Sequence, residues 1–298
     1  MHSAPNLIVS CDGVGSDARF QAARLADLAV RALIAESELT PKPALVDQRG
    51  SGAHTDLSLD LLKRSARSLR DSFERMAGAS FCESPSYRFR ERLGAIGRSA
   101  EDSMLRVTNG INTHRGAIWA LGLLVSSSAM ESSSPEEIAR RAAQIARLPD
   151  RSAPDSETNG TRAARRYKVS GARGEACAGF PHVISAGLPA LRRSRRNGET
   201  ETRARLNALL AIMAELNDTC LLHRGGLAAL KAAQRGAAAV CNAGGTSTER
   251  GWQLLFDLDT ELVSRNSSPG GSADLLAATF FLDFVQAVSH PEDNHGKT

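Results

Sequence analysis

The stretch 18-ARFQAARLADLAVRALIAESEL-39 decides the fold class of this chain. Its apolar residues recur at helical spacing and form one stripe, made of Leu25, Leu28, Ala29, Ala32 and Leu33. Pro41 and Pro43 follow and end this helix, because proline lacks an amide hydrogen and restricts the residue before it. The stretch therefore predicts an amphipathic helix that buries one face against other helices.

The same spacing returns along nearly the whole chain. It predicts further helices over residues 56–76, 87–107, 112–125, 134–148, 174–187, 200–216, 225–243, 246–264 and 273–288. The helix that starts with Ser134 has a cap, a proline in its first turn and a glutamate at the capping-box position. No stretch of useful length alternates as a strand does. We therefore predict an all-α fold, a single globular domain of about nine or ten helices with polar, Gly-rich loops at the helix junctions.

Three segments fall outside this helical pattern. We expect residues 1–17 to form a flexible N-terminal tail and residues 289–298 a C-terminal tail. Residues 18–288 then form the helical domain. Within it, the polar segment 149–165, PDRSAPDSETNGTRAAR, predicts a flexible insertion.

Composition narrows the class of protein. Apolar residues make up 42% of the 298, enough for a sizeable core, and the formal net charge is +4. Aromatic residues make up 4%, too few for a base-stacking platform, so we read the arginine-rich run 192–196 as a solvated surface and expect no nucleic-acid partner. The longest apolar run, 117–125, is about half of what crossing a bilayer needs, and no signal peptide begins the chain. We therefore expect no membrane partner. The five cysteines are scattered without a CxxC pair, which favours reduced thiols in the cytoplasm.

Chemistry-bearing residues gather with glycine at five helix junctions, which we call the junction segments: residues 42–56, 109–118, 170–181, 217–226 and 264–277. Core packing alone does not call for that mixture. In the first segment, two carboxylates and a histidine can hold a divalent metal or share acid–base work. The alternative is an ordinary loop in which Asp56 caps the next helix.

The other four junction segments each combine a polar cluster with a structural alternative. The second has Thr113, His114 and Arg115 at a helix start, where they suit a phosphate group or simple N-capping. The third places Arg173 near Glu175, which suits phosphate binding or a structural ion pair. The fourth contains Asp218, His223 and Arg224, and the fifth contains a serine–glycine run before Asp274. Each of these two sets suits either an anion-binding pocket or capped turns. No Walker loop or Rossmann fingerprint occurs.

Read in order, KPALVDQRGSGAHTD, INTHRGAI, GARGEA, DTCLLHRGG and SPGGSADLLA resemble the motifs of the triphosphoribosyl-dephospho-CoA synthase family. The resemblance runs from about residue 25 to 285, and the last motif with GARGEA is the most specific part. The opening stretch is more similar to the branch that serves malonate decarboxylase than to the branch that serves citrate lyase. This chain departs from the family at two positions, with Ala44 where the family has glycine and Arg115 where it has lysine.

The resemblance implies an unusual transfer reaction. The ribose 2′-hydroxyl of 3′-dephospho-CoA attacks the anomeric carbon of ATP, adenine leaves, and the triphosphate stays on the transferred sugar. The product later becomes the prosthetic group of a decarboxylase or lyase acyl carrier protein, through a downstream transferase. Such a reaction passes through an oxocarbenium-like state and needs two proton transfers and cations for the triphosphate.

We assign the junction residues to these tasks as expectations. The candidates for catalysis are Glu175, His54, His114 and Asp218. The candidates for nucleotide and phosphate binding are Lys42, Asn112, Thr113, Arg115, Arg173, Arg224, Ser268, Gly270, Gly271 and Ser272. The expected metal is Mg²⁺, with Asp47, Asp56 and Asp274 as candidate ligands and Asp218 as a further carboxylate for the same role.

Two other functions fit the same residues. A helical, metal-dependent hydrolase would cut the N-glycosidic bond of a nucleotide with water as the nucleophile. A non-catalytic module would deliver a CoA-type ligand to a partner enzyme, with the acidic residues serving only as caps. All three functions require the junction segments to meet around one nucleotide-sized cavity.

Overall fold

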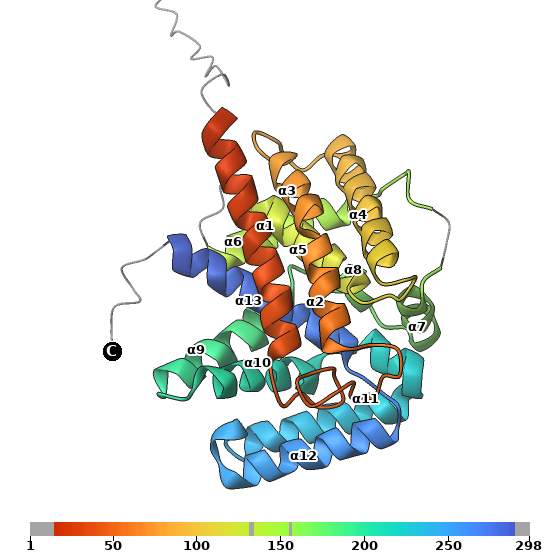
Figure 1. Cartoon of the computed structure of the whole chain (residues 1–298), viewed down its shortest axis with the longest axis vertical. Coiled ribbons are helices and arrows are strands. Elements are labelled where there is room, and N and C mark those ends of the chain that lie inside the picture. The colour runs from red at the N-terminus through yellow and green to blue at the C-terminus, as the bar shows by residue number, and fades with distance from the viewer. Residues whose placement is uncertain (1–14, 131–133, 155–156, 290–298) are drawn as a thin grey trace, which may run out of the picture.

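The computed structural model describes residues 15–130, 134–154 and 157–289 (Figure 1). These residues form thirteen α-helices with no strand, so the predicted all-α fold is confirmed, with more helices than the nine or ten predicted. The helices are α1 (Gly15–Glu38), α2 (Leu59–Ser68), α3 (Arg70–Gly78), α4 (Tyr87–Val107), α5 (Arg115–Ser128), α6 (Pro135–Arg147), α7 (Asn159–Tyr167), α8 (Gly171–Cys177), α9 (Leu188–Arg196), α10 (Glu201–Glu215), α11 (Thr219–Asn242), α12 (Glu249–Ser264) and α13 (Gly270–Ser289). A π-helix, η2 (His182–Gly187), leads into α9, and a short 3₁₀ turn, η3 (Gly245–Ser247), precedes α12.

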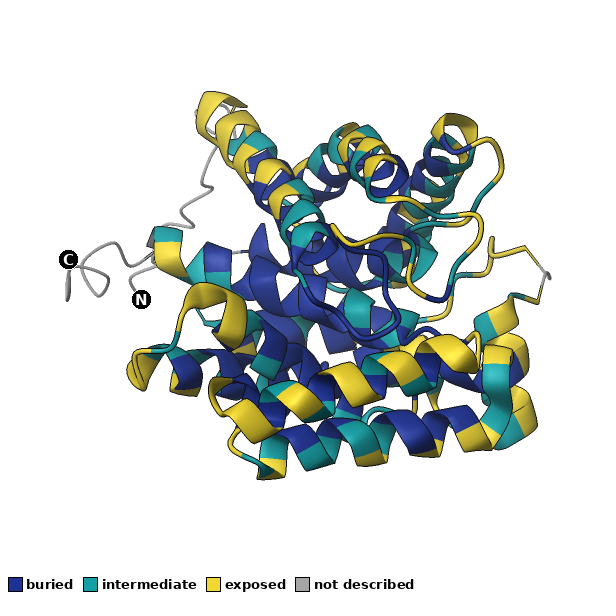
Figure 2. Ribbon diagram, turned by 60° about the horizontal axis from the view of Figure 1, so that its bottom comes forward, coloured by how far each residue is buried: buried dark blue, intermediate teal, exposed yellow. Residues whose placement is uncertain are grey.

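Two helices, α5 and α13, form the centre of the core and pack on each other. Both are apolar around most of their circumference, which is the pattern of a helix surrounded by protein. Figure 2 shows the buried residues gathered in the middle of the molecule, with the exposed ones on the outer faces of the surrounding helices. In the described residues, Gly270–Val288 is the one helix apolar and long enough to cross a membrane, and 56% of it is buried inside the protein. Its apolar character is therefore accounted for by its central place in the core.

Close helix crossings depend on small residues. Gly122 of α5 lies against α3, where an added Cβ would stand 2.8 Å from the sulfur of Met76. Gly187 lies against α13, where a Cβ would stand 2.5 Å from the hydroxyl of Thr279. Larger residues at these two positions would push the helices apart, because a packed core has little free volume.

The single helix predicted over residues 56–76 is wrong, because the structure divides it into α2 and α3 around Leu69. Ser58, not Asp56, caps α2 by accepting a hydrogen bond from the amide of Leu61. Near the break, the Ser68 hydroxyl donates to the carbonyl of Ser65 at 2.7 Å, and such a side chain competes with the regular helical pattern.

Other boundaries also moved. The insertion expected at 149–165 contains most of α7, which is stabilised by a capping box between Thr158 and Thr161. The helix expected to begin at 225 begins at Thr219 and is kinked at Gly226 (φ 65°, ψ −161°), so the fourth junction segment forms the N-cap and the first turns of α11. The start at Ser134 is confirmed, since its side chain accepts from the amide of Glu137. Of the expected tails, 1–17 and 289–298, residues 1–14 and 290–298 lie outside the described residues, whereas 15–17 belong to α1 and 289 to α13.

Candidate functional site

Asp218 joins the N-termini of α11 and α13. Its carboxylate accepts hydrogen bonds from the amides of Cys220 (2.8 Å) and Leu221 (3.4 Å) at the start of α11. It also accepts from the amides of Gly271 (3.2 Å) and Ser272 (2.8 Å), and from the Ser272 hydroxyl (2.9 Å), at the start of α13. Burial raises the pKa of this carboxyl above its usual value, although the hydrogen bonds work in the opposite direction. Asp218 is therefore a cap shared by two helices that are distant in sequence.

Asp274 performs a related task at the N-terminus of α5. It accepts a hydrogen bond from the amide of Ala117, and its carboxyl lies so close to Gly116 that an added Cβ would stand 2.0 Å from Oδ2. Burial of the carboxyl, together with the negative charges of Asp218 and Glu36, raises the pKa of Asp274 well above its usual value. Three carboxylates from α1, the α11 start and α13 thus share one small region.

Lys42 and Asp47 hold the first junction segment in place. The Lys42 ammonium is buried and contacts both the carboxylate of Glu36 (2.5 Å) and its carbonyl (2.6 Å). The buried Asp47 accepts from the amides of Lys42 and Arg49 at 2.8 Å, and from the Arg49 guanidinium. Both predicted site residues are therefore occupied by partners from their own loop or from α1.

Ala44, one of the two departures from the family pattern, lies in the left-handed region with φ 56°. Glycine adopts this conformation without the Cβ clash that other residues meet. The amide of Ala44 donates to Asp259 at 2.7 Å, and its carbonyl accepts from Ala53. These bonds hold the loop in a conformation for which glycine is better suited.

His114 lies beneath the first turn of α5 and is buried. Its Nδ1 is hydrogen-bonded to the Ser65 hydroxyl (2.8 Å), which also contacts the hydroxyl of Thr113 (2.6 Å). Burial, with the nearby charge of Lys42, lowers the pKa of His114 to about 4, so the ring is neutral at neutral pH. Its Nε2 is buried without a hydrogen-bond partner.

Ser268, just before α13, is the second residue of this kind. Its hydroxyl is buried and has no partner, whereas most buried polar atoms in proteins are satisfied. The described residues contain two other such atoms, in Arg90 and Ser126. The second junction segment thus has an unsatisfied imidazole nitrogen, and the fifth has an unsatisfied hydroxyl. A bound ligand would satisfy these two groups.

Arg224 connects the fourth junction segment to the first. Its guanidinium contacts Nδ1 of His54 at 2.9 Å and donates to the carbonyl of Ala53 at 3.2 Å. Burial and the Arg224 charge lower the pKa of His54 to about 4, against the weaker opposing effect of Asp56. The Asp56 side chain is 57% exposed and 3.8 Å from His54, so it neither caps α2 nor points into the core.

The third junction segment brings Glu175 together with His182, a residue that the sequence did not single out. The two Glu175 oxygens contact the His182 amide (3.0 Å) and Nδ1 (2.7 Å). The hydrogen bond that His182 donates to the Glu175 carboxylate raises the pKa of His182, which also bonds to the backbone of Glu215. Glu175 is thus held in an ion pair with the π-helix η2. Arg173, two residues earlier, is exposed.

The five junction segments contact one another, which is the first part of the expectation; the expected cavity is a separate question. Besides the contacts above, Trp119 of α5 donates to the carbonyl of Ala172 at 3.2 Å, and an added Cβ on Gly171 would stand 3.5 Å from the Thr219 methyl. Asn112 accepts from the amide of Arg115 at 3.2 Å, and the Arg115 side chain pairs with Glu101 at 2.9 Å. Gly270 packs against Cys220, where a Cβ would stand 3.0 Å from the sulfur.

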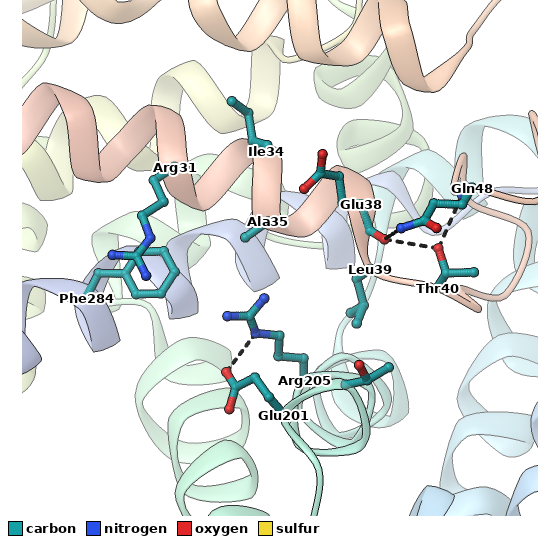
Figure 3. Close-up of a pocket in the computed structure, with 11 residues that line it drawn as sticks. Arg31, Ile34, Ala35, Glu38, Leu39, Thr40, Gln48, Glu201, Arg205 and Phe284 are labelled. Atoms are coloured by element: carbon teal, nitrogen blue, oxygen red, sulfur yellow. Dashed lines mark hydrogen bonds and ion pairs between the residues drawn. The ribbon is translucent and has the colours of Figure 1, made fainter. Parts of the chain in front are cut away.

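The nucleotide-sized pocket shown in Figure 3 lies elsewhere. It measures about 560 Å³ and lies between α1, the loop after it, α10 and α13, with Arg31, Glu38, Arg205 and Phe284 around it. Only Gln48 of the junction segments reaches it. The junction segments are therefore gathered by direct contacts among their own residues rather than around this pocket.

A metal site is the expectation that the geometry supports least. In the residues that the structure describes, no group of three or more His, Cys, Asp or Glu side chains is placed to hold a metal ion. Asp47 is committed to its loop, Asp56 is exposed, and Asp274 faces α5. These three do not form a common site.

The sequence missed Glu36, Ser65 and His182. Glu36 lies in the last turn of α1, where a glutamate is usually exposed to solvent. Ser65 lies within α2, and its sequence context does not distinguish it from any other serine in a helix. A charged residue on the apolar stripe of a helix was the one available signal for Glu36.

Comparison with known proteins shows the family of this chain. Residues 22–292 match the family described as ATP:dephospho-CoA triphosphoribosyl transferase. The chain is 56% identical over 271 residues to a probable 2-(5″-triphosphoribosyl)-3′-dephosphocoenzyme-A synthase of Azotobacter vinelandii, covering 90% of this chain and 93% of that protein. Proteins of the same description from Pseudomonas fluorescens (54%, covering 89% and 92%) and Stutzerimonas stutzeri (55%, covering 91% and 94%) are similar over the same extent. No solved structure matches this chain. The chain belongs to the family of ATP:dephospho-CoA triphosphoribosyl transferases.

Proposed function

We propose that this transferase moves the triphosphoribosyl group of ATP onto the ribose 2′-hydroxyl of 3′-dephospho-CoA where the five junction segments meet, with release of adenine. The observation that carries the placement is the pair of buried, unpartnered polar atoms, Nε2 of His114 and Oγ of Ser268. A buried polar atom without a partner is costly, and a ligand that supplies the partner regains that energy.

His114 is the residue that we propose contacts the acceptor. Its neutral ring presents Nε2 as the free atom, while Nδ1 is held by Ser65. If Nδ1 carries the hydrogen, Nε2 accepts the proton that the 2′-hydroxyl loses as its oxygen bonds to the anomeric carbon. The C–N bond to adenine breaks in the same event. Adenine takes up a proton from water as it leaves, and His114 returns its proton to solvent after the product departs, so that no net proton is gained or lost.

Charge around the junction fits an oxocarbenium-like state. The Asp218 carboxylate, which accepts five hydrogen bonds, provides negative charge for the developing positive charge of the ribose. Glu36 is neutralised by Lys42, and the raised pKa of Asp274 favours its neutral form. Arg115 and Arg224, both at least partly accessible, provide cations for the triphosphate. Gly271 and Ser272 use their amides for Asp218, so we propose phosphate contact for Ser268 ahead of these two.

Mg²⁺ remains part of the proposal as a companion of ATP. The carboxylates of this chain do not form a three-ligand group in the described residues, and Mg²⁺ commonly binds through substrate phosphates with only one or two protein carboxylates. When bound, the ion would neutralise charge on the triphosphate.

The decisive experiment is mass spectrometry of the purified protein incubated with ATP, Mg²⁺ and 3′-dephospho-CoA. We expect free adenine and a CoA-linked triphosphoribosyl product in equal amounts. Free triphosphoribose without a CoA-linked product would indicate the hydrolase. Binding of 3′-dephospho-CoA without adenine release would indicate the delivery module.

The role of His114 has its own test. We expect His114→Gln to lower kcat by about 100-fold or more while both substrates still bind, because a positioned base contributes roughly 10²–10⁴-fold. The control is Lys231→Gln, at an exposed position of α11 outside the junction segments. A kcat for His114→Gln within threefold of the unsubstituted protein would rule out this role.

We further propose that the product becomes the prosthetic group of a malonate decarboxylase acyl carrier protein in the cytoplasm. The support is the resemblance of the opening stretch to that branch of the family. The test is transfer of the purified product to the acyl carrier protein of malonate decarboxylase and to that of citrate lyase, by the transferase of each system. Modification of the citrate lyase protein alone would contradict the proposal.

A further inference from the structure

Three arginines from two helices meet at the edge of the junction segments, and one of them belongs to the third segment. Arg90 and Arg98 lie on α4, and Arg173 lies on α8. Asp150, from the loop after α6, contacts Arg98 at 2.7 Å and Arg90 at 3.6 Å. In the described part of the chain, Asp150 is the one carboxylate in ion-pair contact with these three guanidinium groups, so the cluster carries excess positive charge. We call these four residues the arginine cluster.

The cluster is built into the fold rather than spread over a mobile surface. Asp150 can approach α4 because residue 94 is glycine, where an added Cβ would stand 2.0 Å from its Oδ2. The Arg90 guanidinium stacks over the Trp119 ring at 5.1 Å, and Arg90 is 9% exposed. Its Nε is buried without a hydrogen-bond partner. Burial, with the nearby charges of Arg173 and Arg98, lowers the pKa of Arg90 from its ordinary value.

The cluster lies next to the proposed reaction site. Trp119, whose ring stacks with Arg90, is one helical turn beyond Arg115 on α5. Its indole donates to the carbonyl of Ala172, the residue before Arg173. Glu101, the partner of Arg115, lies on α4 eleven residues after Arg90, about three turns along a similar face. The face of α4 thus runs from the arginine cluster to the second junction segment.

Excess guanidinium charge with an unsatisfied donor is suited to phosphate, because guanidinium binds phosphate oxygens in a forked geometry. The transfer reaction brings together two substrates that each carry a phosphoanhydride chain. We propose that the arginine cluster binds the phosphoanhydride chain of one of these two substrates, through groups other than those that we propose act on the sugar. This proposal rests on the proposed function.

The test measures the binding of each substrate separately. Isothermal titration with ATP and with 3′-dephospho-CoA is carried out on Arg98→Gln and on Arg173→Gln. The Arg173 side chain is exposed, so we expect its replacement to change stability little. We expect one substrate to bind about 10-fold or more weakly in both variants, because a charged hydrogen bond is lost, while the other stays within twofold. The substrate whose binding is weakened is the one whose phosphoanhydride chain the cluster binds. Inorganic pyrophosphate should compete with that substrate in the unsubstituted protein.

Controls separate this proposal from the function. Arg88→Gln, an exposed arginine of α4, should bind both substrates as the unsubstituted protein does. Gly94→Ala should change the binding of the same substrate as Arg98→Gln and leave the other within twofold, because the added methyl displaces Asp150, the carboxylate paired with Arg98 and Arg90. Unchanged binding of both substrates in Arg98→Gln and Arg173→Gln, or an equal loss for both, would overturn the proposal. If instead the unsubstituted protein makes no CoA-linked product, the proposed function fails, whatever these titrations show.

Discussion

Asp218→Ala offers the most direct test of how the site is assembled. The substitution removes five hydrogen bonds: four from backbone amides at the starts of α11 and α13, and one from the Ser272 hydroxyl. Each lost N-cap costs about 1–2 kcal/mol, and the stranded hydroxyl about 1 kcal/mol. We therefore expect the free energy of unfolding to fall by about 3–5 kcal/mol. The four backbone amides remain in the variant without their acceptor. Repacking of apolar side chains cannot supply a new acceptor for them.

Chemical denaturation followed by far-UV circular dichroism measures this change. Asp218→Asn should lose about half as much, because it keeps one acceptor oxygen but turns a donor toward Ser272. Asp102→Ala, at an exposed position of α4, should change the free energy of unfolding by no more than about 0.5 kcal/mol. A loss below about 1 kcal/mol in Asp218→Ala would show that this carboxylate does not hold the two helices together.

Three further predictions concern single positions. Ala44→Gly should raise the free energy of unfolding by about 1 kcal/mol, read from the same denaturation curves, because φ at this position is 56°. His114 has its pKa lowered to about 4, so its contribution to stability is complete above the ordinary pKa of about 6.5 and is lost as pH falls toward 4. His114→Gln should therefore lose about 2 kcal/mol less stability than the unsubstituted protein between pH 7 and pH 4.5; equal losses would exclude this histidine as the cause. Gly116→Ala should lower adenine release more than 10-fold in a chromatographic assay, since the new methyl would stand 2.0 Å from Asp274, and full activity would show that this carboxyl need not stay in place.

Local pattern predicted much of the helical framework because helices form from contacts between near neighbours. The 3.6-residue spacing predicted α4, α6 and α10 to within a few residues. It missed α7, because a polar segment with only one buried side chain, Ala163, looks like a loop. It also missed the break at Leu69, because the apolar stripe continues across it.

The roles of individual site residues required the tertiary structure. Asp218 and Asp274 read equally well as metal ligands, caps or proton carriers, since all three tasks use a carboxylate beside a helix start. Distant partners decide among them: Asp218 is satisfied by two helices, and Asp274 by a third. The Glu36–Lys42 and Glu175–His182 pairs were invisible for the same reason.

The sequence by itself determined the all-α class, most helix positions and the segments that carry polar chemistry, because periodicity and composition are local properties. Only the tertiary structure decided which polar atoms are satisfied and which are left for a ligand. Satisfaction depends on contacts between groups far apart in the chain, such as Asp218 with Ser272 or Arg224 with His54, and those contacts exist only once the helices have packed.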